Sequence, residues 1–331
     1  MKAKVIFATN LVLGAGLLAF VFSRYGSPAL AILGADVSIS TMAAFGAAVA
    51  ASIVSLSGRW GWILRGVCTP PSLMRLTLYR SAAHSLAVLV PSGKIGGDPL
   101  RAWLATRDRV GPGAAIASVA VDRTLELAST SPFSVIFAVL LLQHGVPQLE
   151  RALVTVSVAG LGLIAGITIA ARRLRRGIGL VTPLVQRMRL DRLRIVDRQM
   201  DVLAESDTAA ARLVGEPQRM LVAFFAGLIT NLLVILEFVL LLAAFGLPTE
   251  PTAVVAVIFA TGAAHMLPIP AGIGVLEGAN MWLFQMLGYP ADVGLAVGLA
   301  ARLRELIWML PGVIYLWAGS LSASLSEIRE P

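Results

Sequence analysis

The chain has 331 residues, of which 57% are hydrophobic and only 14% are charged, and its formal net charge is +8. The mean hydropathy is +0.82, and several nearly charge-free stretches of about 18 residues or more are long enough to cross a bilayer. These features indicate a polytopic membrane protein and exclude an ordinary soluble domain. The single cysteine, Cys68, excludes an intrachain disulfide.

Charge-poor runs predict full membrane spans near residues 5–22, 39–57, 114–142, 151–171, 218–245 and 292–320. The first run follows Lys2 and Lys4 and is similar to a signal peptide. No small-x-small cleavage site follows before Arg24, so we expect this span to be retained. Two other apolar segments, about 73–107 and 252–288, are interrupted by glycine and proline. We expect each to form a hairpin that enters the membrane and returns to the same side.

The distribution of arginines predicts the orientation in the membrane. Eleven arginines lie between residues 172 and 219 and four between 59 and 80, whereas the loops predicted near residues 24, 150 and 250 are nearly free of positive charge. Arginine-rich loops are retained in the cytoplasm, so both termini are expected there. The first hairpin then opens to the cytoplasm and the second to the outside.

An internal repeat relates the two hairpins. Residues 91–132 recur at 270–311 without a gap, so a single constant offset aligns the two copies. The matching residues are Pro91 and Pro270, Gly93 and Gly272, Asp98 and Glu277, Trp103 and Trp282, Leu104 and Leu283, Arg123 and Arg302, Glu126 and Glu305, Leu127 and Leu306, and Pro132 and Pro311. Three predicted crossings separate the copies, and an odd number of crossings inverts the second copy relative to the first.

These observations predict an all-α fold with about six full spans and two re-entrant helical hairpins related as an inverted repeat. We expect one membrane domain, 1–331, with repeat 1 at about 73–142, a cytoplasmic basic amphipathic loop at 172–218, and repeat 2 at about 252–320. Inverted repeats of this kind are typical of secondary transporters.

The two predicted hairpin turns are rich in residues that permit unusual backbone geometry: Pro91, Gly93, Gly96, Gly97, Pro270, Gly272 and Gly274. A half-helix is expected to begin at each turn, with Asp98 as a helix cap and Pro99 in the first turn. The positive end of such a helix, assisted by Lys94 in the first turn, suits a phosphate. Alternatively, the glycines and prolines only allow the broken helices to pack, and Asp98 and Glu277 act only as caps.

Two Arg-x-x-Glu pairs, Arg123 with Glu126 and Arg302 with Glu305, place opposite charges on one helix face within apolar spans. They are interpreted either as structural ion pairs or as polar groups that coordinate a head group or a proton. Asp122 has no acidic counterpart. Glu237, inside an apolar run, is another candidate proton site.

No motif supports a soluble type of enzyme chemistry. Lys94 lacks the flanking residues of a phosphate-binding loop, and His84, His144 and His265 have no metal-ligand spacing. We therefore expect no cofactor and no metal. The basic segment 172–218 alternates leucines with arginines, which favours either binding to anionic lipids at the inner leaflet or a solvated loop. It has no Phe, Tyr or Trp, so nucleic-acid binding is not expected.

Three stretches, PSGKIGGDPLRAWLATR, VDRTLE and LPIPAGIGVLEGANMWLFQMLG, resemble signatures of the lysylphosphatidylglycerol synthase transmembrane-region family, also called flippase-like domain proteins. The resemblance covers about residues 40–320, and the GGDPLR and VDRTLE variants are most similar to the hopanoid-associated branch. It implies a lipid-handling protein of the bacterial cytoplasmic (inner) membrane. The chain ends at Pro331 without the soluble aminoacyl-transferase domain, so lysyl transfer is not implied.

The sequence therefore predicts a flippase that moves a phospho-, glyco- or hopanoid lipid between leaflets, with no catalytic residue. We expect the head-group path to be lined by Lys94, Asp98, Arg101, Arg123, Glu126, Glu277, Arg302 and Glu305. A membrane-embedded lipid-modifying transferase and a small-solute or ion transporter remain alternatives. The expected partners are the membrane lipid itself and anionic lipids at the basic loop, and formation of a homo-oligomer is left open.

Overall fold

The computed structural model describes residues 2–89, 96–143, 150–189, 192–193, 197–267 and 269–327, and these ranges contain helices but no strand. The elements are α1 (Lys2–Ala35), α2 (Ile39–Leu64), α3 (Leu73–Leu89), α4 (Asp98–Thr106), α5 (Pro112–Gln143), α6 (Glu150–Arg175), α7 (Val181–Arg187), α9 (Met200–Gly215), α10 (Pro217–Ala244), α11 (Pro251–Met266), the short 3-10 helix η3 (Pro270–Gly272), α12 (Val275–Met286) and α13 (Ala291–Glu327). The predicted all-α class is confirmed.

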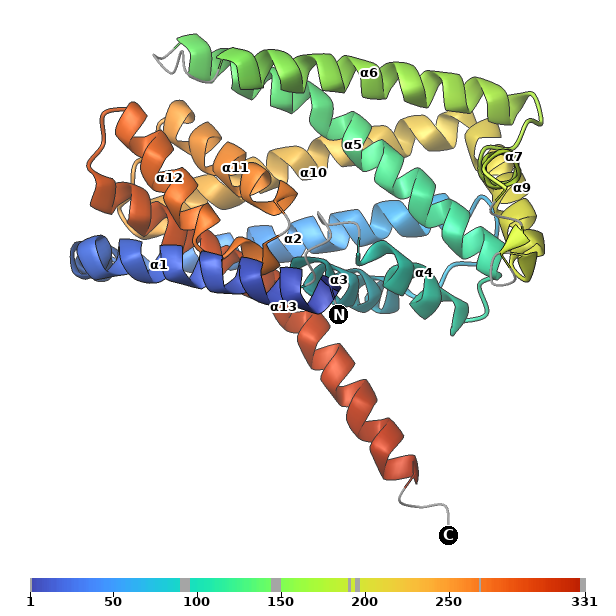
Figure 1. Ribbon diagram of the computed structural model, residues 1–331, viewed down its shortest axis with the longest axis horizontal. Coiled ribbons are helices and arrows are strands. Elements are labelled where there is room, and N and C mark those ends of the chain that lie inside the picture. Colours follow the sequence, from blue (N-terminus) through green and yellow to red (C-terminus); the bar gives the residue numbers. More distant parts are fainter. Residues whose placement is uncertain are drawn as a thin grey trace.

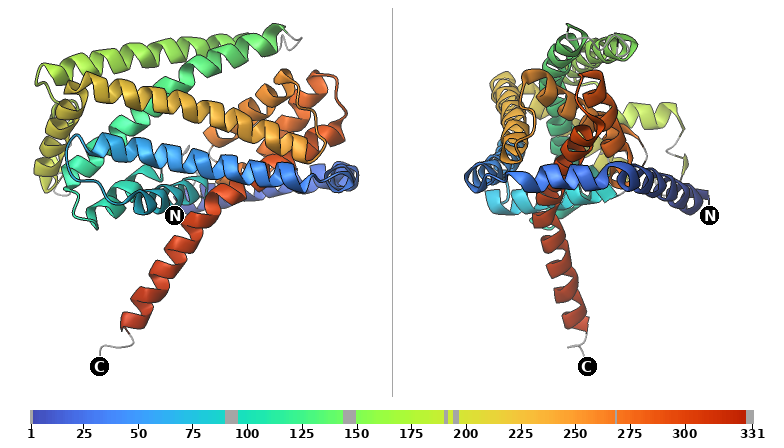
Figure 2. Two further views of the ribbon diagram at one scale, coloured as in Figure 1. Left: turned by 180° about the vertical axis from the view of Figure 1, so that it is seen from behind. Right: turned by 90° about the vertical axis from the view of Figure 1, so that its left-hand side faces the viewer.

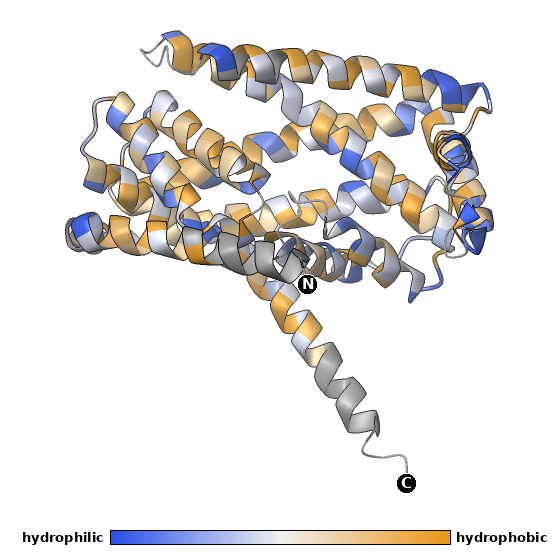
Figure 3. Cartoon of the chain, viewed as in Figure 1, coloured by the Kyte–Doolittle hydropathy of each residue, from blue (hydrophilic) through white to orange (hydrophobic). Residues whose placement is uncertain are grey.

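Long helices form a bundle whose axes run roughly side by side (Figure 1). Four of them are long and apolar enough to cross a membrane: α2, α5, α10 and the part of α1 from Ala15 to Ala35. Hydrophobic residues run along these helices, whereas hydrophilic residues gather at the end that carries α7 and α9 (Figure 3). Many of the apolar side chains of α2, α5 and α10 are exposed. This distribution is that of a membrane protein, and the count of six spans stays a prediction.

Helices α2 and α10 form an antiparallel pair in extensive contact. The N–H of Ser38, which caps α2, donates to the carbonyl oxygen of Ala244 at the end of α10 (2.9 Å), and Arg219 at the start of α10 donates to the carbonyl oxygen of Trp62 near the end of α2 (2.9 Å). Midway between these contacts, Ser55 Oγ and Thr230 Oγ1 are hydrogen-bonded at 2.9 Å. The two helices therefore run in opposite directions over their whole length.

Two pairs of short helices enter the bundle from opposite ends (Figures 1 and 2). The first pair, α3 and α4, has 17 and nine residues, and the second pair, α11 and α12, has 16 and 12. Each helix is shorter than the roughly 20 residues that span a bilayer. The inner ends meet near the middle, where η3 contacts α3. These lengths and positions fit the expected re-entrant hairpins.

The constant offset seen in the sequence, which places Pro91 on Pro270, also relates the helices. At this offset the first residues of α2, α3, α4 and α5 fall on positions 218, 252, 277 and 291, each within two residues of the start of α10, α11, α12 and α13. We call α2–α5 the first helix set and α10–α13 the second. The match between helix starts thus extends beyond the predicted repeats to include the antiparallel pair α2 and α10.

Two spans differ from the prediction. Arg24, taken as part of a loop after a span at 5–22, lies inside α1, which continues through Pro28 to Ala35. A single exposed arginine does not stop a helix whose backbone hydrogen bonds have no better partner in lipid. The last helix, α13, is longer than the predicted 292–320, and its C-terminal part projects out of the bundle (Figures 1 and 2).

The basic segment is partly folded onto the bundle rather than wholly peripheral. Helix α9 packs against α5 and α6, and Leu213 and Ala209 on its inner side are buried. Asp207 of α9 accepts hydrogen bonds from three successive backbone N–H groups, those of residues 180–182, at 2.9–3.0 Å. Burial raises the pKa of Asp207, but these donors outweigh that effect and hold the pKa below its usual range.

We expect Asp207→Asn to release α7 from α9, because an amide is a weaker acceptor for three backbone donors. Trypsin should then cut the arginines around α7 faster in the variant than in the wild-type protein, as measured by mass spectrometry of the fragments. Since the pKa of Asp207 is lowered in the folded protein, the contact should persist above about pH 4 and weaken as the pH falls through the lowered value. Equal cleavage rates in both proteins would contradict this account.

Gly312 marks a very close approach between the two helix sets. A Cβ atom there would overlap the carbonyl oxygen of Ser81 in α3, and nearby Ser85 Oγ donates to the carbonyl oxygen of Met309 at 2.9 Å. We expect Gly312→Ala to lower the melting temperature in detergent, although alanine favours a helix by about 1 kcal/mol. Gly162→Ala on α6, where a Cβ meets nothing within 4 Å, is the matched control and should be neutral or stabilising. Similar shifts for both variants would argue against the tight crossing.

Candidate functional site

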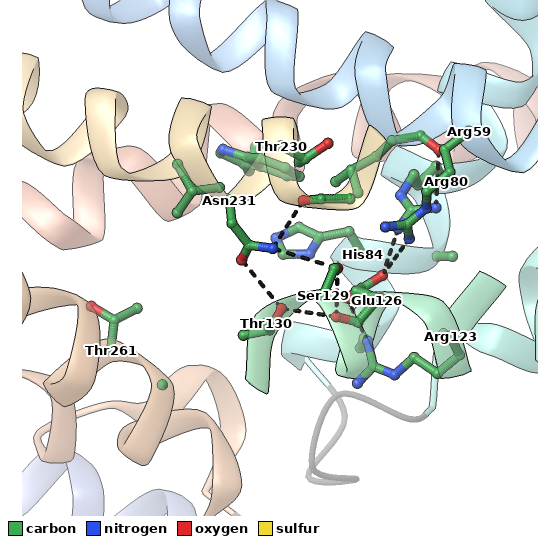
Figure 4. A pocket seen from close by; sticks show the side chains of 18 of the residues that line it. Arg59, Arg80, His84, Arg123, Glu126, Ser129, Thr130, Thr230, Asn231 and Thr261 are labelled. Carbon is green, nitrogen blue, oxygen red and sulfur yellow. Dashed lines mark hydrogen bonds and ion pairs between the residues drawn. The ribbon is translucent and has the colours of Figure 1, made fainter. Parts of the chain in front are cut away.

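A cavity of about 310 Å³ lies between the two helix sets, lined by residues of α2, α3, α4, α5, α10, α11 and α13. Figure 4 shows Arg59, Arg80 and Glu126 on one side, and Thr261 of α11 across the open space. Thr130 of α5 lies 3.2 Å from Asn231 of α10 and connects the two sets at the cavity wall. The cavity is thus polar and formed jointly by both sets.

Asp122 of α5 is fully buried and holds three arginines from three other helices. Its Oδ1 accepts from Arg59 Nε (2.8 Å), and its Oδ2 accepts from Arg80 Nη1 (2.8 Å) and Arg101 Nη1 (2.6 Å). A buried carboxylate is stable only when paired and hydrogen-bonded, and here each oxygen has a charged donor. Asp122 therefore ties α2, α3 and α4 to α5.

Glu126, one turn further along α5, is the second acidic centre and reaches the cavity surface. It accepts from Arg80 (2.8 Å), Arg123 (2.9 Å) and Arg59 (3.4 Å), and its side chain is 30% exposed. Arg123 also lies 3.9 Å from Asp98, and both of these side chains are about a quarter exposed, at 27% and 24%. Arg123, Glu126 and Asp98 are thus the charged groups that an occupant of the cavity could contact.

Arg101 is positioned more deeply. Its guanidinium lies 4.9 Å from the centre of the Trp60 ring, a cation–π distance, while Trp60 Nε1 donates to Ser118 Oγ at 3.1 Å. Arg101 also donates to Asp98 at 3.2 Å, one turn earlier on the same helix. Gly97, just before α4, allows this helix to begin against α3, since a Cβ there would overlap the carbonyl oxygen of Ala83.

The second hairpin uses its charges differently. Glu277 accepts from Arg302 at 2.8 Å and, through its other oxygen, from the N–H of Gly274 at 2.9 Å. Arg302 further donates to the carbonyl oxygens of Ala271 and Gly272 in the turn. Ala271, Gly272 and Gly274 all have positive φ angles, so the arginine holds a turn of unusual geometry. In each hairpin an acid lies near an arginine of the next helix, Asp98 near Arg123 and Glu277 near Arg302. Only the second pair also makes hydrogen bonds to the backbone of its own turn.

Two more buried pairs complete the second set. His265 Nε2 lies 2.7 Å from Glu305 Oε2, and Glu237 Oε2 accepts from Arg304 Nε at 2.6 Å and from Trp308 Nε1 at 3.1 Å. The predicted Arg302–Glu305 pair is wrong, because Arg302 is drawn to Glu277 and the turn. The predicted Arg123–Glu126 pair is present.

Of the predicted path residues, Asp98, Arg101, Arg123 and Glu126 line the cavity together, whereas Glu277, Arg302 and Glu305 do not. Pro91, Gly93 and Lys94 lie outside the described residues. Gly96 and Gly97 precede α4, Pro270 and Gly272 form η3, and Gly274 caps α12. Asp98 is not a cap, since it is the first residue of α4 and its carboxylate turns to arginines.

Sequence reasoning missed Arg59 and Arg80 as site residues. Both belong to the stretch that was interpreted only as a topological signal, yet both are buried against Asp122. The signal in the sequence that could have identified them is their position inside otherwise apolar helices. The structure explains this position, because both arginines pair with the buried Asp122. Charges at such positions face the protein interior rather than lipid.

The Lysylphosphatidylglycerol synthase TM region family matches residues 7–312 of the chain. Since the match covers nearly the whole chain, the protein belongs to this family. A comparison with curated proteins gives no match. The resemblance of the turn motifs is confirmed at the level of the family, which indicates a membrane function related to lipids.

We expect Asp122→Asn to destabilise the protein severely, because it leaves three buried arginines short of a counter-charge, a loss of about 3–5 kcal/mol. The measurement is the folded fraction by fluorescence-detected size exclusion and thermal unfolding in detergent. Glu216→Gln, which breaks an ion pair with Arg219 at the exposed start of α10, is the control and should cost at most about 1 kcal/mol. A stable Asp122→Asn variant would show that Asp122 does not organise the first set.

Proposed function

We propose that the protein is a lipid flippase, in which the polar cavity between the two helix sets carries a head group across the membrane while the acyl chains stay in lipid. The observation that carries the proposal is the cluster of partly exposed charges, Asp98, Arg123 and Glu126, at the boundary between two oppositely directed sets of helices. Charged groups within membrane proteins typically mark the path of a substrate.

The balance of charge at the cavity favours an anionic head group. Four arginines of the first set surround it, Arg59, Arg80, Arg101 and Arg123, against the three acids Asp98, Asp122 and Glu126. The one other charged lining residue in the described part of the chain, Arg304, is balanced by Glu237. Among the described residues, the charged groups around the cavity therefore carry one positive charge in excess, which a phosphodiester neutralises.

Movement is proposed to follow the symmetry of the helix sets. The antiparallel helices α2 and α10 occupy matching positions in the two sets, and the two short-helix pairs enter from opposite ends (Figure 1). Such an arrangement supports an inverted repeat and alternating access, in which one set rocks against the other. No nucleotide-binding motif accompanies the site in the sequence, so a lipid gradient or a coupled ion supplies the driving force.

The remaining expectations enter the same proposal. The arginine-rich end with α7 and α9 is assigned to the cytoplasm, where its arginines contact anionic lipids of a bacterial inner membrane. The protein is a transporter rather than an enzyme and works without a cofactor. Assignment to the hopanoid-associated branch rests on the turn motifs alone.

We expect Arg123→Gln to slow translocation of fluorescent NBD-phosphatidylglycerol in reconstituted vesicles about tenfold or more, while the protein remains folded. Arg123 supplies a charged contact at the cavity surface, and such contacts contribute about 1.5–3 kcal/mol. Translocation is measured by the loss of NBD fluorescence when dithionite is added outside. NBD-phosphatidylcholine, which has no net negative charge, should move more slowly in the wild-type protein.

Two controls accompany this measurement. Arg151→Gln on the exposed side of α6 should leave the rate unchanged. Arg302→Gln, at the matching position of the second set, should lower the melting temperature because it removes the contacts that hold the turn. Equal translocation by folded Arg123→Gln and wild-type protein would remove the cavity from the mechanism.

A further inference from the structure

The hydrogen-bond geometry of His265 and Glu305 requires a proton between the two side chains. His265 Nδ1 lies 2.6 Å from the carbonyl oxygen of Thr261, one turn earlier in α11. A carbonyl oxygen can only accept, so Nδ1 must carry a hydrogen. The other ring nitrogen, Nε2, lies 2.7 Å from the carboxylate oxygen of Glu305, and without a proton this contact would set two lone pairs against each other. A proton must therefore sit between Nε2 and Oε2.

From this geometry we propose that His265 and Glu305 form the proton-binding site that couples lipid movement to a pH gradient. The inference rests on the proposed function and adds its driving ion. With the proton bound, the pair is either an imidazolium with a carboxylate or a neutral imidazole with a carboxylic acid, and both are held by one hydrogen bond. When the proton leaves to water, the neutral ring retains its hydrogen on Nδ1, and its Nε2 lone pair faces an ionised carboxylate.

Loss of the proton therefore separates the two residues. Both side chains are almost fully buried, at 6% and 3% exposure, so water does not weaken their repulsion in the closed arrangement. His265 belongs to α11, part of the re-entrant pair, and Glu305 belongs to α13, so the hydrogen bond joins the hairpin to the following span. The change of one proton thus acts directly on the element expected to open and close.

The site is linked to the cavity through α11. Thr261, whose carbonyl oxygen accepts from His265, lines the cavity together with its neighbour Gly262, and Arg304 beside Glu305 lines it from α13. A displacement of α11 away from α13 therefore changes the cavity wall itself. This connection is what makes a proton on the pair a coupling proton rather than a structural one.

The charged or titratable groups on the helices packed against α11 and α13 include Arg80 and His84 on α3, Arg59 on α2, Asp122, Arg123 and Glu126 on α5, Glu237 on α10, Glu277 on α12, Arg302 and Arg304 on α13, and Arg24 on α1. Arg24 is exposed, and the interior arginines and acids among them are ion-paired with one another or within the Asp122 cluster. These arginines and acids already pair with one another, and His84 packs against the Trp308 ring with the ring centres 5.3 Å apart. The mobile proton is therefore assigned to His265 and Glu305, whose side chains are in direct contact. Histidine is the side chain that ordinarily changes its charge between about pH 5 and 8.

The first test examines the proton itself, with no transport involved. Nitrogen NMR of histidine-labelled protein in detergent should show His265 with a hydrogen on Nδ1 at all pH values and an Nε2 signal that shifts as the proton shared with Glu305 is lost with rising pH. The His84→Gln and His144→Gln variants assign the signal by elimination, so the test does not need a folded His265 variant. A neutral ring with its single hydrogen on Nε2 and a bare Nδ1 would overturn the proposal, as would a ring whose state is independent of pH.

The second test measures coupling. Wild-type protein in phosphatidylcholine vesicles with NBD-phosphatidylglycerol should move the probe about fivefold faster or more when a pH gradient is imposed, the lower end of ordinary coupling. His265→Gln and Glu305→Gln should still exchange the probe but ignore the gradient, whereas His144→Gln should respond like wild type. Probe movement that ignores the gradient in the wild-type protein would overturn the proton site and leave the flippase intact. No movement in any condition would instead overturn the proposed function, while the NMR result still decides the proton site.

Discussion

The structure depends on one electrostatic requirement, that charge buried in an apolar bundle must be paired at short distance. Asp122 meets this requirement for three arginines at 2.6–2.8 Å, and those arginines come from α2, α3 and α4. Removing any one partner leaves an uncompensated charge, so the four helices hold one another in place. The short helices α3 and α4, each with fewer residues than a bilayer span needs, are fixed by these contacts rather than by hydrophobic length.

The helices of the two sets correspond, but their chemistry does not. When the sets are aligned by the repeat, Asp122 matches Ala301, Arg59 matches Phe238, and Arg80 matches Phe259. The charged cluster therefore exists once, on the first set, and Phe238 of the second set lines the same cavity beside Val234. The cavity wall of the second set thus mixes polar side chains such as Thr230 and Asn231 with apolar ones, and it carries fewer charges than the wall of the first set. The two sets therefore share their helix order but present unlike surfaces to the cavity, because a few buried positions differ.

Much of the fold followed from the sequence because its causes are local. Span positions follow from hydropathy, and the matching helix starts of the two sets from a constant offset between Gly, Pro and charged residues, so most helices begin within a few residues of prediction. Pairing did not follow, because it depends on which helices become neighbours. Spacing of three residues predicted Arg302 with Glu305, yet the three-dimensional turn offers Arg302 two carbonyl oxygens and Glu277. Arg59 and Arg80 were missed for the same reason, since the partner they share, Asp122, lies 63 and 42 residues away along the chain.

The equivalent acids Asp98 and Glu277 have different partners because they occupy different positions in the first turn of their helices. Asp98 is the first residue of α4, whereas Glu277 is the third residue of α12, whose N-cap is Gly274. From the third position a glutamate reaches back to the N-cap N–H, as in a capping box, while an aspartate at the first position does not. Both carboxylate oxygens of Glu277 therefore accept hydrogen bonds, one from Gly274 in its own turn and one from Arg302, and the side chain is almost completely buried. Asp98, whose carboxylate receives no backbone hydrogen bond from the part of the chain that the structure describes, instead stays at the cavity surface beside Arg123. This difference of two helix positions thus makes Glu277 a structural acid and leaves Asp98 at the cavity surface.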